Sequence, residues 1–217
     1  MQDIWGKPVY GSCDAILGGA RLAVMVVDMQ NDFCHPDGYY GKLGLDLGDI
    51  RAAVGRMATV VEAARAAEIP VIWIQQTLLP QARADSPAWL RRRTRGVLAP
   101  EWTLEGSWGQ RFTLPLSPSS GEPVIVKHRS SAFVSTSLDL ILRSLEVEAL
   151  LIGGTVTQGC VESTARDATF YDYYVVLLTD CVATTDRAVH AASLVCQSSR
   201  YEFADSASVI PCLSARL

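Results

Sequence analysis

The stretch RLAVMVVDMQNDF, residues 21–33, decides the fold. Its first part, residues 21–28, is a run of apolar and β-branched residues that ends in one acidic residue, Asp28. An apolar run without alternation is typical of a strand buried on both faces, and such strands belong to parallel sheets covered by helices. The stretch therefore predicts a central strand whose carboxyl end carries a carboxylate.

Working outward, apolar runs of strand length alternate with segments of helical period. Strands that alternate with helices imply crossover connections and a mostly parallel sheet. The expected fold is one three-layer α/β/α, Rossmann-like domain over residues 1–217, with five to six strands. The predicted strands are 21–28, 69–75, 122–127, 147–153, 173–179 and a short 208–210, and the predicted helices are 49–67, 136–145, 160–172 and 186–203.

A long insert interrupts this alternation between residues 76 and 121. The insert holds five prolines and a basic stretch, Arg91–Arg93 with Arg95. A connection of this length is typical of a lid or a binding loop. Because the net charge of the chain is negative, the basic stretch is interpreted as a solvated helix face rather than a nucleic-acid patch. A subunit contact or a docking site for an anionic substrate is the alternative.

The composition excludes several classes of protein. The chain has 217 residues, 49% hydrophobic and 19% charged, and its net charge is −4, which argues against disorder and against a nucleic-acid partner. Its apolar runs are far shorter than the roughly 18 residues of a membrane helix, so no membrane partner is expected. The N-terminus lacks the pattern of a secretory signal, and the six cysteines form no C-x-x-C pair. We expect a cytoplasmic protein with reduced thiols.

Three reactive side chains follow predicted strands. Asp28 ends the first strand, Lys127 ends the third, and Cys160 begins a helix after the glycine-rich turn that follows the fourth. Ligands of open parallel sheets bind at the carboxyl ends of strands. A helix N-terminus and an ammonium favour a thiolate, and a carboxylate can accept and return its proton. Each residue alone has a structural explanation, but the three together predict a nucleophilic site.

Three blocks of the sequence resemble those of the isochorismatase-like cysteine hydrolases: VVDMQNDF (26–33), VKHRSSAF (126–133) and GTVTQGCVESTARDA (154–168). The resemblance extends from about residue 21 to 209. It implies that Cys160 is the nucleophile, Asp28 the general base and acid, and Lys127 the group that adjusts both charges. It also implies a cis peptide bond at Thr155–Val156 and an oxyanion hole formed by the N–H groups of Val156 and Cys160.

Departures within the family narrow the expectation. Nicotinamidase-like members have an Asp and His metal cluster after the second strand, whereas residues 74–87 here contain no histidine, so we expect no metal and no cofactor. Vinyl-ether-cleaving isochorismatases have glycine at the place of Cys160. The segments 35–46, 86–90 and 105–112 resemble ureidoacrylate amidohydrolases, and VKHRSSAF is similar to N-carbamoylsarcosine amidohydrolase.

The sequence therefore predicts hydrolysis of a C–N bond in a ureido, N-carbamoyl, amide or lactam small molecule, through a thioester or thiocarbamate. The alternatives are a non-catalytic α/β binding module and a vinyl-ether hydrolase. The resemblance also implies a homo-oligomer, a dimer or tetramer. The candidate substrate-binding residues are Phe33, Gln76, Phe133 and Thr157.

Overall fold

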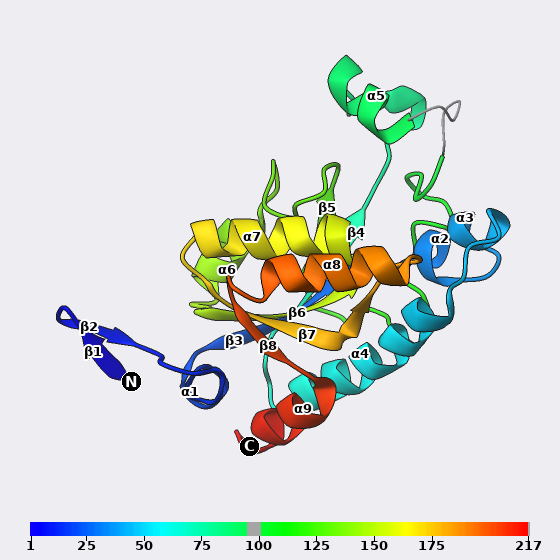
Figure 1. The fold of residues 1–217 in the computed structure, drawn as a ribbon. Coiled ribbons are helices and arrows are strands. Elements are labelled where there is room, and N and C mark those ends of the chain that lie inside the picture. The colour runs from blue at the N-terminus through cyan, green and yellow to red at the C-terminus, as the bar shows by residue number, and fades with distance from the viewer. Residues whose placement is uncertain (95–100, 217) are drawn as a thin grey trace.

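The fold is a doubly wound parallel sheet, described from a computed structural model that covers residues 1–94 and 101–216 (Figure 1). Within these residues six strands form the central sheet in the order β5-β4-β3-β6-β7-β8, and every neighbouring pair is parallel. The strands are β3 (Leu22–Val27), β4 (Val71–Gln76), β5 (Val124–Lys127), β6 (Ala149–Thr155), β7 (Tyr174–Ala183) and β8 (Glu202–Ala204). The expected fold class is confirmed.

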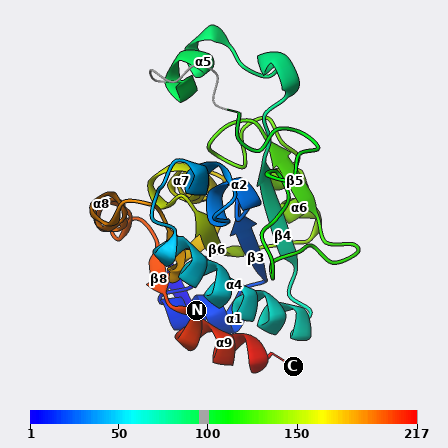
Figure 2. The same cartoon turned by 90° about the vertical axis from the view of Figure 1, so that its right-hand side faces the viewer.

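Helices cover both faces of the sheet and make three layers (Figures 1 and 2). Side chains of β3 alternate between two apolar clusters, one shared with the helices of one face and one with those of the other, as a strand buried on both faces requires. The first face carries α1 (Cys13–Gly19), α4 (Gly48–Ala66) and α9 (Ser206–Ser214), and the second carries α6 (Leu138–Ser144), α7 (Glu162–Phe170) and α8 (Arg187–Gln197). No helix of the described residues has the length and apolar character needed to cross a bilayer.

The direction of winding reverses between β3 and β6. From β3 the chain passes to β4 and β5 on one side, and it then returns to place β6 on the other side of β3. Gly154 permits the close approach of the two strands there, because its φ is +149° and a Cβ at this position would lie 2.2 Å from the carbonyl oxygen of Val27. Folds of this kind bind ligands outside the strand ends around such a reversal.

The C-terminal elements correct one sequence prediction. Residues 208–210 were expected to form a strand, but they lie in α9, and the sixth strand is β8, whose first two residues fall in the predicted helix 186–203. The reason is local: the carboxylate of Asp205 accepts from the N–H of Ser208 and the Ser208 hydroxyl lies 3.3 Å from the N–H of Asp205, a capping box that begins α9. The helix α8 ends at Gln197, which leaves 202–204 to pair with the edge of β7.

Other differences concern the ends of the chain and the insert. An antiparallel hairpin of β1 (Gln2–Ile4) and β2 (Lys7–Val9) precedes α1, and the sequence pattern did not predict it. Short helices α2 (Asn31–Cys34) and α3 (Tyr39–Lys42) follow β3. In the insert, the 3-10 turn η1 (Pro80–Ala82) and α5 (Pro87–Thr94) project from the body in both views (Figures 1 and 2). Residues 95–100, including the basic Arg95, lie outside the described residues.

Candidate active site

An ion pair between two buried side chains forms the centre of the site. Asp28 follows β3 and Lys127 ends β5, two strands apart in the sheet. Asp28 Oδ2 lies 2.7 Å from Lys127 Nζ, and neither side chain is exposed to solvent. Burial of a charge is costly unless an opposite charge and hydrogen bonds compensate it, so such a pair needs further partners.

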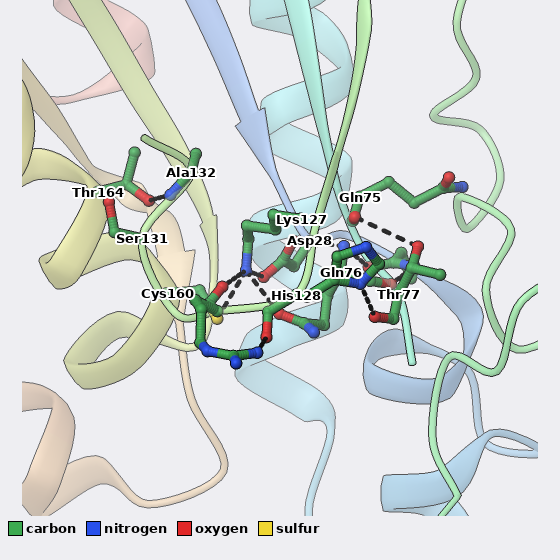
Figure 3. A network of polar contacts seen from close by, with 12 residues as sticks. Asp28, Gln75, Gln76, Thr77, Lys127, His128, Ser131, Ala132, Cys160 and Thr164 are labelled. Atoms are coloured by element: carbon green, nitrogen blue, oxygen red, sulfur yellow. Dashed lines mark hydrogen bonds and ion pairs between the residues drawn. The ribbon is translucent and has the colours of Figure 1, made fainter. Parts of the chain in front are cut away.

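The ammonium group of Lys127 has three such partners (Figure 3). It donates to Gln76 Oε1 at 2.9 Å and to the carbonyl oxygen of Arg129 at 3.0 Å. It also lies 3.2 Å from the sulfur of Cys160. Lys127 therefore connects the carboxylate of Asp28 to the thiol of Cys160, and the three predicted catalytic residues lie together.

The carboxylate of Asp28 is fixed from the neighbouring strand. The backbone N–H of Gln76, at the end of β4, lies 3.0 Å from Asp28 Oδ1 and 2.9 Å from the side-chain oxygen of Gln30. The Gln30 amide in turn donates to the carbonyl oxygen of Gln76 at 2.9 Å. Asp28 itself has a φ of +51°, a left-handed conformation that Asp tolerates better than most residues, so the chain turns sharply as it leaves β3.

Cys160 lies in a single helical turn before α7. The turn η2 (Thr157–Val161) has π-helical spacing, and the N–H groups of Gly159 and Val161 both donate to the carbonyl oxygen of Val156. Such single turns are frequent at functional sites. The Thr155–Val156 peptide bond is cis, as the resemblance implied.

The charges of the site are coupled. Burial raises the pKa of Asp28, while the ammonium of Lys127 and a hydrogen bond from the Cys160 thiol oppose that rise. For Lys127, burial lowers the pKa but the carboxylate of Asp28 and the sulfur of Cys160 outweigh it, and the net direction is upward. Lys127 is therefore a cation at neutral pH.

Burial and the charge of Asp28 raise the pKa of Cys160 to about 12, and the ammonium of Lys127 offsets only part of this. The ammonium favours the thiolate, as the sequence suggested, but burial and the carboxylate of Asp28 outweigh it. The resting group is a neutral thiol, and a neutral thiol becomes a nucleophile only when a base takes its proton. Asp28 is the base within reach.

The predicted substrate-binding residues have other neighbours in this structure. Phe33, on α2, lies in the core cluster on the α4 side and packs on Tyr40 with ring centres 5.1 Å apart. Phe133 lies in the opposite cluster and stacks on Tyr171 at 4.9 Å. The hydroxyl of Thr157 is fully buried and pairs with a ring nitrogen of His190 at 2.9 Å. Of this group, Gln76 has a direct hydrogen bond to one of the three predicted catalytic residues, Lys127.

Sequence reasoning missed one residue that joins the insert to the site. Arg129 gives its carbonyl oxygen to Lys127, and its guanidinium donates to the carbonyl oxygen of Ala84 at 2.9 Å. The same guanidinium lies 4.8 Å from the ring centre of Trp89 on α5, and Arg92 lies at the same distance from that ring. The insert is thus attached two residues after Lys127, at an arginine of the block 126–133 to which the sequence reasoning gave no role.

One broad groove of the described residues lies away from this chemistry. It has a volume of about 1340 Å³ and runs between α4 and residues 108–118, with Arg51, Arg111 and Trp108 among its walls. Asp28, Lys127 and Cys160 do not line it. We place the active site on the reactive groups rather than on this groove.

Among the described residues, no group of three or more His, Cys, Asp or Glu side chains is arranged to hold a metal ion. The reactive atoms of the site are instead a carboxylate, an ammonium and a thiol. A parallel α/β sheet that presents these groups where its winding reverses defines a cysteine hydrolase of the three-layer α/β class. The chain belongs to the isochorismatase family, because the isochorismatase domain matches residues 22–202.

Relatives with named activities agree with this placement. A ureidoacrylate amidohydrolase of Azorhizobium caulinodans is 35% identical over 170 residues, 74% of this chain and 75% of the relative. The structure of a cysteine hydrolase from Pseudomonas syringae pv. phaseolicola superposes with a TM-score of 0.78 at 27% identity, covering 91% of this chain and 94% of the other. N-carbamoylsarcosine amidase from Thermoplasma acidophilum gives 0.68 at 26% identity, with coverage of 86% and 96%.

Proposed function

We propose that this chain hydrolyses the C–N bond of a ureido, N-carbamoyl, amide or lactam small molecule through a covalent intermediate on Cys160. The observation that carries the proposal is the contact of one ammonium, that of Lys127, with both the Asp28 carboxylate at 2.7 Å and the Cys160 sulfur at 3.2 Å. The ureidoacrylate and N-carbamoylsarcosine relatives support a C–N bond as the point of attack.

The first half of the reaction uses one proton. Asp28 accepts the proton of the Cys160 thiol as the sulfur forms a bond to the substrate carbonyl carbon. The carbonyl oxygen becomes an oxyanion, which the N–H groups of Val156 and Cys160 hold in our proposal. The protonated Asp28 then gives its proton to the leaving nitrogen, the C–N bond breaks, and an amine or ammonia departs. A thioester or thiocarbamate remains on the sulfur.

The second half restores the enzyme. Asp28, again a carboxylate, removes a proton from water as the water oxygen attacks the acyl carbon, and the sulfur leaves as a thiolate that regains the proton from Asp28. Lys127 keeps its proton throughout, because its raised pKa suits a permanent cation. It balances whichever of the two neighbours carries the negative charge at each step.

Gln76 supports a ureido or carbamoyl substrate. Its side-chain oxygen accepts from Lys127, which orients the amide so that its NH₂ group is the part left for a substrate carbonyl. A non-catalytic binding module, the first alternative, would not explain the buried ion pair of Asp28 and Lys127. Cleavage of a vinyl ether, the second alternative, would not explain the thiol of Cys160.

A substrate screen tests the proposal. Ureido acids, N-carbamoyl amino acids, biuret and cyclic lactams are incubated with the purified chain, and ammonia release and product mass are measured. We expect turnover within the ureido or carbamoyl group and a transient mass increase on the peptide that contains Cys160. Vinyl-ether cleavage without any C–N hydrolysis would contradict the proposal.

Chelation should leave the activity intact. The proposed chemistry takes its nucleophile from Cys160 and its acid from Asp28, and it needs no metal-bound water. We expect the same rate before and after exhaustive treatment with EDTA or phenanthroline, measured on the best substrate of the screen. A loss that zinc restores would contradict this mechanism.

Three further features remain proposals. We propose a homo-oligomer, dimer or tetramer, which light scattering of the purified chain tests. The free state of the six cysteines supports a cytoplasmic location. The attachment of the insert at Arg129 supports the expectation that residues 76–121 form a lid on a single domain.

A further inference from the structure

The helix α8 packs chiefly on the turn that carries the nucleophile. Its contacts with other elements are concentrated on η2, residues 157–161. Figure 1 shows α8 lying along α7, the helix that continues from this turn. The buried residues of α8 are Ser193 and Gln197, both polar. Leu194 of α8 packs against the apolar cluster of this face, and hydrogen bonds from polar side chains also join α8 to η2 and α7.

One of these bonds reaches the turn itself. His190 Nδ1 lies 2.9 Å from the hydroxyl oxygen of Thr157, the first residue of η2 and three positions before Cys160. The Thr157 side chain has no solvent exposure, and this is its hydroxyl's one hydrogen bond within the described residues. A buried hydroxyl without a partner is costly, so the bond ties the position of the turn to that of α8.

The protonation of His190 suits an acceptor. Burial lowers the pKa of His190, and the carboxylate of Asp49 opposes this only in part. The ring is then neutral at neutral pH, and a neutral imidazole offers one nitrogen as an acceptor. We assign the Thr157 hydroxyl as the donor and Nδ1 as the acceptor, which places the ring proton on the other nitrogen.

Other bonds hold α8 in place independently of His190. The hydroxyl of Ser193 lies 2.5 Å from Glu162 Oε2, on α7. At the other end of α8, the guanidinium of Arg187 meets both carboxylate oxygens of Asp49 at 2.7 and 2.9 Å. Removal of the His190 ring therefore leaves α8 anchored, and its effect falls on the catalytic turn.

We propose that His190 is a positioning residue for the nucleophile: through the hydroxyl of Thr157 it fixes the turn that carries Cys160 and the backbone N–H groups beside it. The inference rests on the function proposed above. It assigns to Thr157 an indirect role in place of the expected contact with substrate, because its hydroxyl is already committed to the ring. Small displacements of a reacting group cost rate rather than substrate affinity.

Four variants test the bond from both sides. His190→Ala and Thr157→Val each remove it, and Thr157→Val does so while keeping the side-chain volume. We expect kcat to fall on the order of 10²-fold in each, with KM nearly unchanged. His190→Asn offers an amide oxygen at the place of Nδ1, and Thr157→Ser keeps the hydroxyl, so both should recover most of the rate.

The double variant Thr157→Val with His190→Ala should be no slower than either single variant, because both remove the same interaction. Val195→Ala, on the exposed side of α8, is the matched control and should behave as the unmodified chain. Thermal unfolding establishes that each variant is folded. Since Thr157→Val leaves α8 untouched, it remains decisive where His190→Ala fails to fold.

Three outcomes would overturn the inference. They are a full kcat in a folded His190→Ala or Thr157→Val variant, additive losses in the double variant, and a rise in KM alone. A rise in KM alone would indicate that Thr157 contacts the substrate directly. Failure of the proposed function is a separate result, because it would show as activity that survives in Cys160→Ala whatever His190 does.

Discussion

Replacement of Cys160 by alanine should abolish turnover while the fold stays intact. The sulfur is the atom that forms the covalent bond in the proposed reaction, and alanine offers nothing in its place. We expect the rate to fall by roughly 10⁴–10⁶-fold, the size of effect seen when a covalent nucleophile is removed. The measurement is initial rate on the best substrate of the screen, with circular dichroism and thermal unfolding to verify the fold.

Cys181→Ala is the matched control for this variant. Cys181 is fully buried in β7 and packs in the core cluster on the α4 side, so its loss affects packing and not chemistry. We expect catalysis close to that of the unmodified chain and a modest loss of stability. Equal losses in the two variants would show that the rate depends on the core rather than on the thiol at Cys160.

The neutral state of the thiol makes this prediction more specific. Because the pKa of Cys160 is about 12, general alkylating reagents at neutral pH have no activated thiolate to select there. The exposed Cys196 is the more accessible target for them. We therefore expect iodoacetamide to alkylate Cys160 slowly. A substrate whose binding drives transfer of the thiol proton to Asp28 should acylate Cys160 faster.

The parallel sheet could be predicted because its strands are buried on both faces. A run such as Arg21–Asp28 has no polar face, so burial fixes both its conformation and its place at the centre of the sheet. The short strand Glu202–Ala204 has no such run, and its burial is only partial. Pairing with β7 and the capping box at Asp205 decide its structure, and these are tertiary and local contacts that periodicity does not show.

The same distinction applies to the site. The sequence could place Asp28, Lys127 and Cys160 together because each lies at or after the end of a strand of one parallel sheet, and topology brings such positions to one edge. The direction in which their pKa values shift could not be predicted, because the pKa of Cys160 depends on its burial and on its distance from Asp28. Arg129 lies in the block 126–133, but its contact with Ala84, like that of His190 with Thr157, joins groups far apart in the sequence, and no motif predicts either contact.

Replacement of Asp28 by asparagine should cost roughly 10²–10⁴-fold in turnover, the usual contribution of a general base. Asparagine keeps the shape and the acceptor for the N–H of Gln76, so the loss reports the missing proton acceptor. The variant should fold, which thermal unfolding verifies. Full activity in Asp28→Asn would contradict the assignment of the base.

The pH dependence of the two proteins gives the sharper test. In the unmodified chain activity requires ionised Asp28, and because burial raises its pKa, the acid limb should lie above the range of an ordinary aspartate, about pH 4. The pKa of Lys127 is raised chiefly by the negative charge of Asp28, so the ammonium persists and the alkaline limb lies high. The limbs describe the coupled set rather than single residues.

Asp28→Asn should change both limbs in a defined direction. The acid limb that reports the carboxylate disappears, because asparagine does not titrate. Lys127 then keeps its burial but loses the charge that raised its pKa, so the pKa falls and the alkaline limb moves to lower pH. The residual rate of the variant, measured from pH 5 to 10, should therefore decline at a pH where the unmodified chain is still at its plateau. An alkaline limb that stays at the same pH would show that Asp28 and Lys127 are not electrostatically coupled. Lys127 would then not balance the negative charge that moves between Asp28 and Cys160 in the proposed reaction.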